Sequence, residues 1–208
     1  MSSDISANYR EFHTEEEAEG WAWDNYADLL SIDIESELYK IISAYTGSWY
    51  KSLNELLRAC PPIGTPEFNS VNFGVYEENK QALLAINDML KHYCLKENII
   101  VYRFTHLSCI IKMTHNMPRK GICFYDKAFV STTLVKHLLK DFERDNHCTC
   151  LLKLFLPKGT PGAYVSFKQD KSLLNEQEFL LPPNIKMKIT KAHYLKWPIQ
   201  IDCTAILT

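Results

Sequence analysis

The spacing of the apolar residues changes near residue 95, and this change restricts the fold more than any other feature of the sequence. Before it, Leu30, Ile34, Leu38, Ile41 and Ile42 recur at three- and four-residue steps, which predicts an amphipathic helix. After it, short apolar runs are separated by turn residues, which is typical of β-strands. We therefore predict an α+β fold in which an N-terminal helical subdomain packs on a mixed, mainly antiparallel β-sheet.

The individual elements follow from the same patterns. The sequence is helical in pattern from residue 21 to 58, but Gly47 is expected to break the helix, so that a second helix runs over 48–59. We predict a loop at 60–75 and further helices at 77–93, 106–113 and 134–144. Strands are predicted at 99–104, within 121–133 as far as Ser131, and at 149–156, 163–167, 178–181, 186–191 and 198–207.

The length and charge of the chain restrict its organisation and its partners. A chain of 208 residues without a linker-like segment is expected to form one domain, with an acidic lead at 1–20, a helical part at 21–95 and a β-rich catalytic core at 96–208. A net charge of -2 gives no reason to expect nucleic acid or an anionic membrane as partner. The sequence contains no apolar run long enough to span a bilayer, and its N-terminus lacks the features of a secretory signal.

The cysteines indicate reduced thiols. Their number, 7, is odd and they are scattered along the chain, which disfavours a disulfide framework. His147-Cys148-x-Cys150 is the one cluster that suggests a metal, but it lacks a second ligand pair at zinc-like spacing. We predict no metal site and expect Cys148 and Cys150 to share one buried face of a strand.

Two carboxylates stand close together near the end of the chain. Glu176 and Glu178 lead into the apolar run Phe179-Leu180-Leu181. If the backbone is extended there, both side chains lie on one face, roughly 7 Å apart. One carboxylate could stabilise a developing positive charge while the other acts on an incoming nucleophile. The structural alternative is a solvated polar turn before a strand.

Two earlier segments favour the catalytic interpretation. Arg103 lies inside an apolar strand-like run, and Ser131-Thr132-Thr133 follows Phe129-Val130. This ordered set, ending in Glu-x-Glu, resembles the R-S-E class of arginine-specific mono-ADP-ribosyltransferases, which includes bacterial binary-toxin enzymatic components and related exoenzyme toxins. The resemblance runs from about Tyr26 to the C-terminus, and it implies an ADP-ribosyltransferase-like fold.

The resemblance also implies a role for each residue of the set. Glu178 would stabilise the oxocarbenium-like ribose and Glu176 would orient the attacking guanidinium. Ser131 would orient Glu178, and Arg103 would bind the pyrophosphate or hold the strand that carries the carboxylates. The residues implied to line the NAD cleft are Tyr45, Tyr50, Asn54, Arg58, Arg103, Thr132 and Phe142. The two tyrosines and Asn54 are also suited to this by their chemistry, and the alternative is that Tyr45 and Tyr50 are aromatic residues at the edge of the core.

The function implied is a mono-ADP-ribosyltransferase toxin or effector that uses NAD as substrate, needs no metal and modifies an arginine of a target protein. Actin is possible but not favoured as the target, because Leu173 stands where relatives that modify actin often carry an aromatic residue. An NAD glycohydrolase and a catalytically silent protein-binding member of the fold are the alternatives. We expect a monomeric bacterial protein, secreted or translocated, that acts in the cytosol of a target cell.

Overall fold

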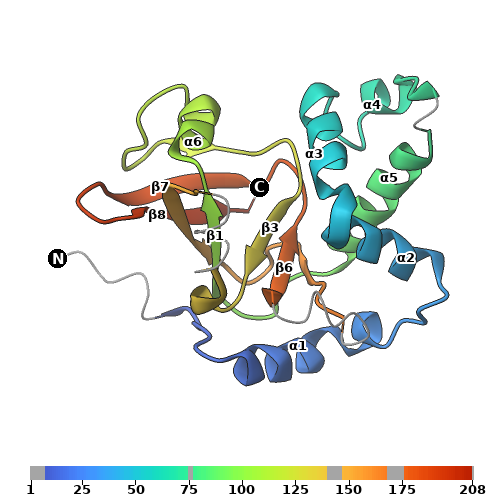
Figure 1. Ribbon diagram of the computed structural model, residues 1–208, viewed down its shortest axis with the longest axis horizontal. Helices are drawn as coiled ribbons and strands as arrows, with labels where there is room; N and C mark the ends of the chain where they lie inside the picture. The colour runs from blue at the N-terminus through green and yellow to red at the C-terminus, as the bar shows by residue number, and fades with distance from the viewer. Residues whose placement is uncertain (1–7, 75–76, 140–146, 168–175, 208) are drawn as a thin grey trace.

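The computed structural model describes residues 8–74, 77–139, 147–167 and 176–207, and it has two parts. The helices of the first part are α1 (Glu15–Leu30), α2 (Glu37–Ala44), α3 (Tyr50–Ala59), α4 (Pro66–Ser70) and α5 (Glu77–His92). In Figure 1, α2 to α5 lie on one side of the sheet and α1 runs along its lower edge. The second part contains the strands and the short helix α6 (Leu107–Thr114).

Eight strands form one sheet. They are β1 (Ile99–Thr105), β2 (Cys123–Phe124), β3 (Val130–Thr133), β4 (Cys150–Leu156), β5 (Ala163–Tyr164), β6 (Glu178–Leu181), β7 (Lys186–His193) and β8 (Ile199–Ile206). Their order is β2-β7-β8-β4-β1-β3-β6-β5. Neighbouring strands are antiparallel except for the parallel pair β4 and β8. The predicted α+β fold with a mixed, mainly antiparallel sheet is therefore confirmed.

Hydroxyl side chains set where several helices begin. The Thr14 hydroxyl accepts a hydrogen bond from the Glu17 amide at 3.2 Å, so α1 begins at Glu15, and the predicted boundary of the acidic lead at residue 20 falls inside this helix. The Thr65 hydroxyl caps α4 in the same way, with Pro66 in the first turn. The sequence pattern predicts a loop here and gives no sign of α4, because a helix this short has too few turns to show an apolar period.

The predicted break at Gly47 is wrong. Residues Tyr45–Trp49 form a π-helical turn that joins α2 to α3. A π-helical turn adds a residue without ending the helix, so it changes which side chains face the sheet. The predicted helix at 134–144 is represented by a short 3-10 helix, Lys136–Leu138, and residues 140–146 lie outside the described part of the chain.

The expected shared face of Cys148 and Cys150 is also wrong. Both side chains are buried, but Cys150 belongs to the main core beneath the helices, whereas Cys148 packs in a smaller cluster with Tyr102 and Phe104. Among the described residues, no group of three or more His, Cys, Asp and Glu side chains could hold a metal ion. No helix in the described ranges is long and apolar enough to cross a membrane.

The backbone at Gly162 lies so close to β6 that it fixes the position of this strand. Gly162 lies directly before β5, with a φ of 153°. A β-carbon there would lie 2.8 Å from Phe179 Cε1 and 2.9 Å from the Leu180 carbonyl oxygen, both in β6. The Gly162 carbonyl also accepts a hydrogen bond from the Tyr26 hydroxyl in α1, at 3.4 Å. A glycine is therefore required where α1, β5 and β6 meet.

We expect Gly162→Ala to lower the free energy of unfolding by about 2 kcal/mol, because β6 must move to admit the methyl group. Urea denaturation measures the change. Gly20→Ala is the matched control: it lies inside α1 with no atom within 4 Å of the added carbon, so helix propensity should raise stability by about 0.5–1 kcal/mol. Equal stability of Gly162→Ala and the wild type would contradict the packing described.

Candidate active site

Three neighbouring strands bring Arg103, Ser131 and Glu178 together. These residues lie on β1, β3 and β6, which are adjacent in the sheet. Arg103 Nη1 donates a hydrogen bond to the Ser131 carbonyl oxygen at 2.7 Å. The Ser131 hydroxyl donates in turn to the Glu178 carboxyl. Ile99 and Val101 share the face of β1 that carries Arg103, and they pack in the main core, so this is the face covered by the helical part.

Glu178 is a buried carboxyl group, and only a few contacts offset its loss of contact with water. Only 5% of the residue is exposed. Burial raises its pKa to about 7, and the negative charge of Glu176 acts in the same direction. The hydrogen bond from Ser131 and the positive charge of Arg103 oppose this increase. The group therefore changes its charge within the physiological pH range, as expected of a functional carboxylate rather than of a solvated polar turn.

The expected extended backbone from Glu176 to Glu178 is wrong. Gln177 between them has a φ of 47°, in the left-handed region, and β6 begins only at Glu178. Gln177 is fully buried: its side-chain oxygen accepts from the Tyr164 hydroxyl at 2.9 Å, and its carbonyl accepts from the Leu134 amide at 3.0 Å. A left-handed conformation costs a non-glycine residue about 1 kcal/mol or more, and these hydrogen bonds hold it in place.

This turn gives the two carboxylates different surroundings. Glu176 is exposed, whereas Glu178 is buried at the start of β6. The protein around the Glu176 carboxyl still raises its pKa by desolvation. Gln177 and Tyr164 create this difference, and neither could be predicted from the sequence, because a buried amide between two glutamates has no spacing signal.

Hydrogen bonds on both sides fix β6 next to Ser131. The Glu178 amide donates to the Ser166 hydroxyl at 2.7 Å, and the Thr132 hydroxyl donates to the Phe179 carbonyl oxygen at 2.5 Å. Thr132 is buried and follows Ser131 in the strand, so the two side chains point to opposite faces. The structure therefore gives Thr132 a bond within the sheet, and its contact with NAD stays a prediction.

Tyr45 and Asn54 form a buried pair behind Glu178. They are 1% and 7% exposed, and Asn54 Nδ2 lies 3.1 Å from the Tyr45 hydroxyl oxygen. The Tyr45 ring packs edge-on against Phe129, with the ring centroids 5.4 Å apart. Burial raises the Tyr45 pKa, and the charge of Glu178 raises it further, which places the hydroxyl near that carboxyl. The ring is thus part of the core rather than an open stacking surface, and contact of this pair with NAD stays a prediction.

Arg58 forms a two-pronged ion pair that the sequence analysis did not foresee. Its Nε and Nη2 atoms donate to the Asp126 carboxylate at 3.0 and 2.7 Å. Asp126 also accepts from the Ala128 amide at 3.0 Å, so the pair joins α3 to the segment that leads into β3. The Asp126-Lys127-Ala128 turn is recognisable from sequence, but its partner is not. The predicted contact of Arg58 with NAD remains untested.

The remaining predicted cleft residues differ in accessibility. Tyr50, at the start of α3, is 38% exposed, and the Lys51 ammonium lies 5.8 Å from its ring centroid. Its ring is therefore available for stacking, as a cleft residue requires. Phe142 lies outside the described residues.

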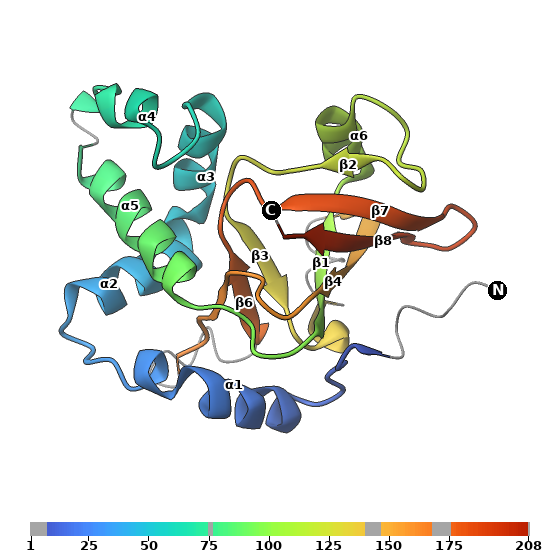
Figure 2. The ribbon, with the colours of Figure 1, turned by 180° about the vertical axis from the view of Figure 1, so that it is seen from behind.

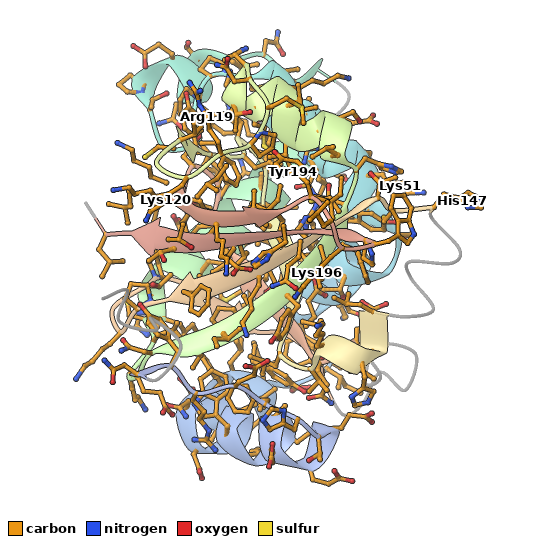
Figure 3. All side chains as sticks on the ribbon, turned by 90° about the vertical axis from the view of Figure 1, so that its left-hand side faces the viewer. Lys51, Arg119, Lys120, His147, Tyr194 and Lys196 are labelled. Atoms are coloured by element: carbon orange, nitrogen blue, oxygen red, sulfur yellow. The ribbon has the colours of Figure 1, made fainter. Side chains whose placement is uncertain are left out.

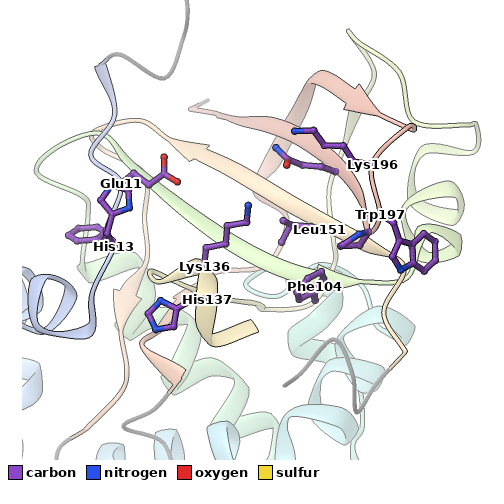
Figure 4. A pocket seen from close by; sticks show the side chains of 11 residues that line it. Glu11, His13, Phe104, Lys136, His137, Leu151, Lys196 and Trp197 are labelled. Atoms are coloured by element: carbon purple, nitrogen blue, oxygen red, sulfur yellow. The ribbon is translucent and has the colours of Figure 1, made fainter. Parts of the chain in front are cut away.

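A cleft of about 530 Å³ lies on the other face of the sheet (Figure 4). Phe104 and Leu151 lie at its base, and Lys136, Lys196 and Trp197 are among the residues around it. Phe104 follows Arg103 in β1, so its side chain points away from the face that carries Arg103. None of the four predicted catalytic residues lines this cleft.

A comparison of the whole chain with known sequences identifies its family. The sequence model of the ADP-ribosyltransferase exoenzyme family matches residues 18–204. The chain belongs to this family. The match includes the helical part as well as the sheet, and it contains Arg103, Ser131, Glu176 and Glu178.

One curated relative of this exoenzyme is the NAD(+)–arginine ADP-ribosyltransferase EFV of Enterococcus faecalis. The two are 31% identical over 107 residues, which make up 50% of this chain and 20% of that protein. The exoenzyme therefore aligns with about a fifth of the relative's length.

Solved structures share the fold. The C3stau2 structure from S. aureus, determined with NAD, has a TM-score of 0.73 at 18% identity and covers 97% of this chain and 100% of that one. Plx2a, an ADP-ribosyltransferase toxin from Paenibacillus larvae, gives 0.69 at 19% identity, with 95% and 99% coverage. BECa of C. perfringens, determined with NADH, gives 0.65 at 23% identity and covers 95% of the exoenzyme but 50% of its own chain.

The raised pKa of Glu178 predicts the pH dependence of NAD cleavage. A carboxyl with a raised pKa is neutral below it, and a neutral carboxyl cannot stabilise a positive charge. We expect kcat/KM for NAD cleavage to fall as the pH falls through about 7, the pKa of Glu178 in the free enzyme. Initial rates of nicotinamide release between acidic and alkaline pH measure this.

Two variants should move the midpoint in opposite directions. Glu176→Gln removes a negative charge that raises the Glu178 pKa, so the midpoint should move down. Ser131→Ala removes the hydrogen bond that lowers this pKa, so the midpoint should move up. A profile that stays flat to acidic pH, or the same midpoint in both variants, would contradict the assignment of the titration to Glu178.

Proposed function

We propose that this exoenzyme transfers ADP-ribose from NAD to an arginine side chain of a target protein and releases nicotinamide. The observation that carries the proposal is the contrast between two carboxylates on either side of Gln177. Glu178 is buried and bonded to Ser131, whereas Glu176 is exposed. One carboxylate suits a closed site for a charged intermediate, and the other can be reached by a second substrate.

Glu178 acts on the ribose. The bond between ribose C1′ and the nicotinamide nitrogen breaks, and its electron pair leaves with nicotinamide, which becomes neutral. The ribose takes on the positive charge, and the ionised Glu178 stabilises it from a fixed position. The Ser131 hydroxyl holds the carboxylate, so little reorganisation is needed as the charge develops.

Arg103 supports this step in two ways. One of its nitrogen atoms donates to the Ser131 carbonyl oxygen, which holds β3 in position. A guanidinium has five N–H groups, so others remain to bind the NAD pyrophosphate. The positive charge near Glu178 also favours the ionised form of the carboxylate.

Glu176 acts on the acceptor. A guanidinium nitrogen of the target attacks C1′ and then loses a proton, which the exposed Glu176 carboxylate is placed to accept. Desolvation raises the pKa of this carboxyl, which makes it a better base than an ordinary glutamate. The Enterococcus faecalis relative is named an arginine ADP-ribosyltransferase, which supports an arginine acceptor.

The biological setting is inferred from the family. Relatives with this fold include bacterial toxins, one of them from Paenibacillus larvae. We propose an exported bacterial toxin or effector that acts as a monomer in the cytosol of a target cell. Actin is not favoured as its target.

Glu176→Gln should separate transfer from NAD cleavage. Without the acceptor carboxylate, labelling of arginine-containing protein should fall about 100-fold or more, while nicotinamide release into water stays within a few-fold of wild type. Labelled NAD and a cell lysate measure transfer, and nicotinamide release measures cleavage. Glu178→Gln is the control and should lose both activities.

Two outcomes would contradict this division of roles. Equal loss of transfer and cleavage in Glu176→Gln would place both residues on the ribose. Label on a residue other than arginine, identified by mass spectrometry in the wild-type reaction, would exclude the proposed acceptor.

A further inference from the structure

The β-sheet ends in a protruding tip on the side away from the helices α2 to α5. The tip is the turn between β7 and β8, residues 194–198, together with the neighbouring loop at 115–121. The Tyr194 hydroxyl donates to the Pro118 carbonyl oxygen, and the Gly121 amide donates to the Ile189 carbonyl oxygen at 2.8 Å, so turn and loop form one unit. Figures 1 and 2 place the β7–β8 turn at the opposite end of the molecule from α2 to α5.

Large apolar side chains are exposed on this tip. Leu195 is fully exposed at 104%, Trp197 is 75% exposed, and Met117 and Tyr194 are 53% and 42% exposed. A tryptophan, a tyrosine, a leucine and a methionine on one protruding unit form a patch that soluble surfaces usually avoid.

The same unit is strongly basic, although the whole chain has a net charge of -2. Residues 115–121 and 194–198 contain three cations, Arg119, Lys120 and Lys196, and no aspartate or glutamate. Arg119, Lys120 and Lys196 face the same side of the molecule as Tyr194 (Figure 3). Within the described ranges, no ion pair engages these three cations.

Two carboxylates close to the tip, one in β8 and one in the cleft, already have hydrogen-bond partners elsewhere. Asp202 in β8 is paired with His193 at 3.2 Å and accepts from Gln200 at 2.7 Å. Glu11, in the cleft beside Lys196 and Trp197, accepts from Lys153 at 3.0 Å. Arg119, Lys120 and Lys196 are all exposed, so their charges are accessible to solvent.

We propose that this tip docks the protein on an anionic phospholipid surface. Tryptophan and tyrosine favour the boundary between headgroups and acyl chains, and Leu195 can enter the acyl region. Arg119, Lys120 and Lys196 would lie at the level of the phosphates, where each cation contributes to binding. A convex tip favours a lipid surface, which adapts to its shape, over a protein partner that would need a complementary groove.

Docking in this way leaves the enzyme able to work. The tip and α2 to α5 are at opposite ends of the molecule, so the face of the sheet that carries Glu178 is not covered (Figure 1). The bilayer would hold the enzyme at a membrane surface, where it would meet target proteins that are themselves bound there.

Flotation of the full chain with vesicles tests the proposal. We compare vesicles of phosphatidylcholine alone with vesicles that contain about one third phosphatidylserine, at low and at high salt. We expect binding to the anionic vesicles that is about tenfold stronger than to the neutral ones and that weakens with salt.

Two pairs of variants separate the apolar and the basic contributions. Leu195→Ser with Trp197→Ser should weaken binding to anionic vesicles about tenfold or more, and Lys120→Glu with Lys196→Glu should do the same. Ile34→Ser and Lys91→Glu, at exposed positions of the helical part, are the matched controls and should bind as the wild type does. All variants should keep the circular-dichroism spectrum and the thermal unfolding midpoint of the wild type, which shows that they are folded.

Several results would overturn the proposal. The proposal is wrong if the wild type does not bind anionic vesicles at low salt. It is also wrong if the tip variants bind as well as the controls. Capture of an acidic protein that depends on the tip, without vesicle binding, would assign the patch to a protein partner instead. The vesicle assay does not depend on the acceptor or on NAD cleavage, so its failure is distinct from failure of the proposed function.

Discussion

The removal of the Glu178 carboxyl from water is the interaction on which the rest of the site depends. Burial favours the neutral acid, whereas stabilisation of a ribose cation needs the anion. Ser131 and Arg103 shift the balance back far enough for the group to ionise near neutral pH. An anion held in a nearly dry site acts on a developing positive charge more strongly than one in water, because less solvent screens it. In the proposed mechanism, the raised pKa of Glu178 and its effect on the ribose cation thus have the same cause.

Several structural features serve to hold this carboxyl in place. β6 is fixed by its pairing with β3 and β5, by the Ser166 hydroxyl and by the close contact at Gly162. Gln177, directly before β6, has a left-handed backbone conformation, so the extended backbone of β6 does not include Glu176. As a result, neighbouring positions present one buried and one exposed carboxylate. A regular strand would have given both residues the same surroundings.

The sequence predicted those parts of the structure that depend on local patterns. The bounds of β6 were predicted correctly, and the order of Arg103, Ser131 and Glu178 along the chain led us to expect that they meet. The residues that hold them could not be found, because their partners are distant. Gln177 is held by Tyr164 and Leu134, and Arg58 by Asp126. The burial of Tyr45 depends on the π-helical turn, which a lone Gly47 does not reveal.

Direct titration of the Glu178 carboxyl tests the central claim most closely. The protein is labelled with ¹³C at glutamate side-chain carboxyls, and the carboxyl signals are followed by NMR from acidic to alkaline pH. Glu178→Gln assigns the signal by its loss. We predict one glutamate that titrates near 7, where burial places Glu178. Titration of every glutamate below about 5, in the range of solvated carboxyls, would contradict the account.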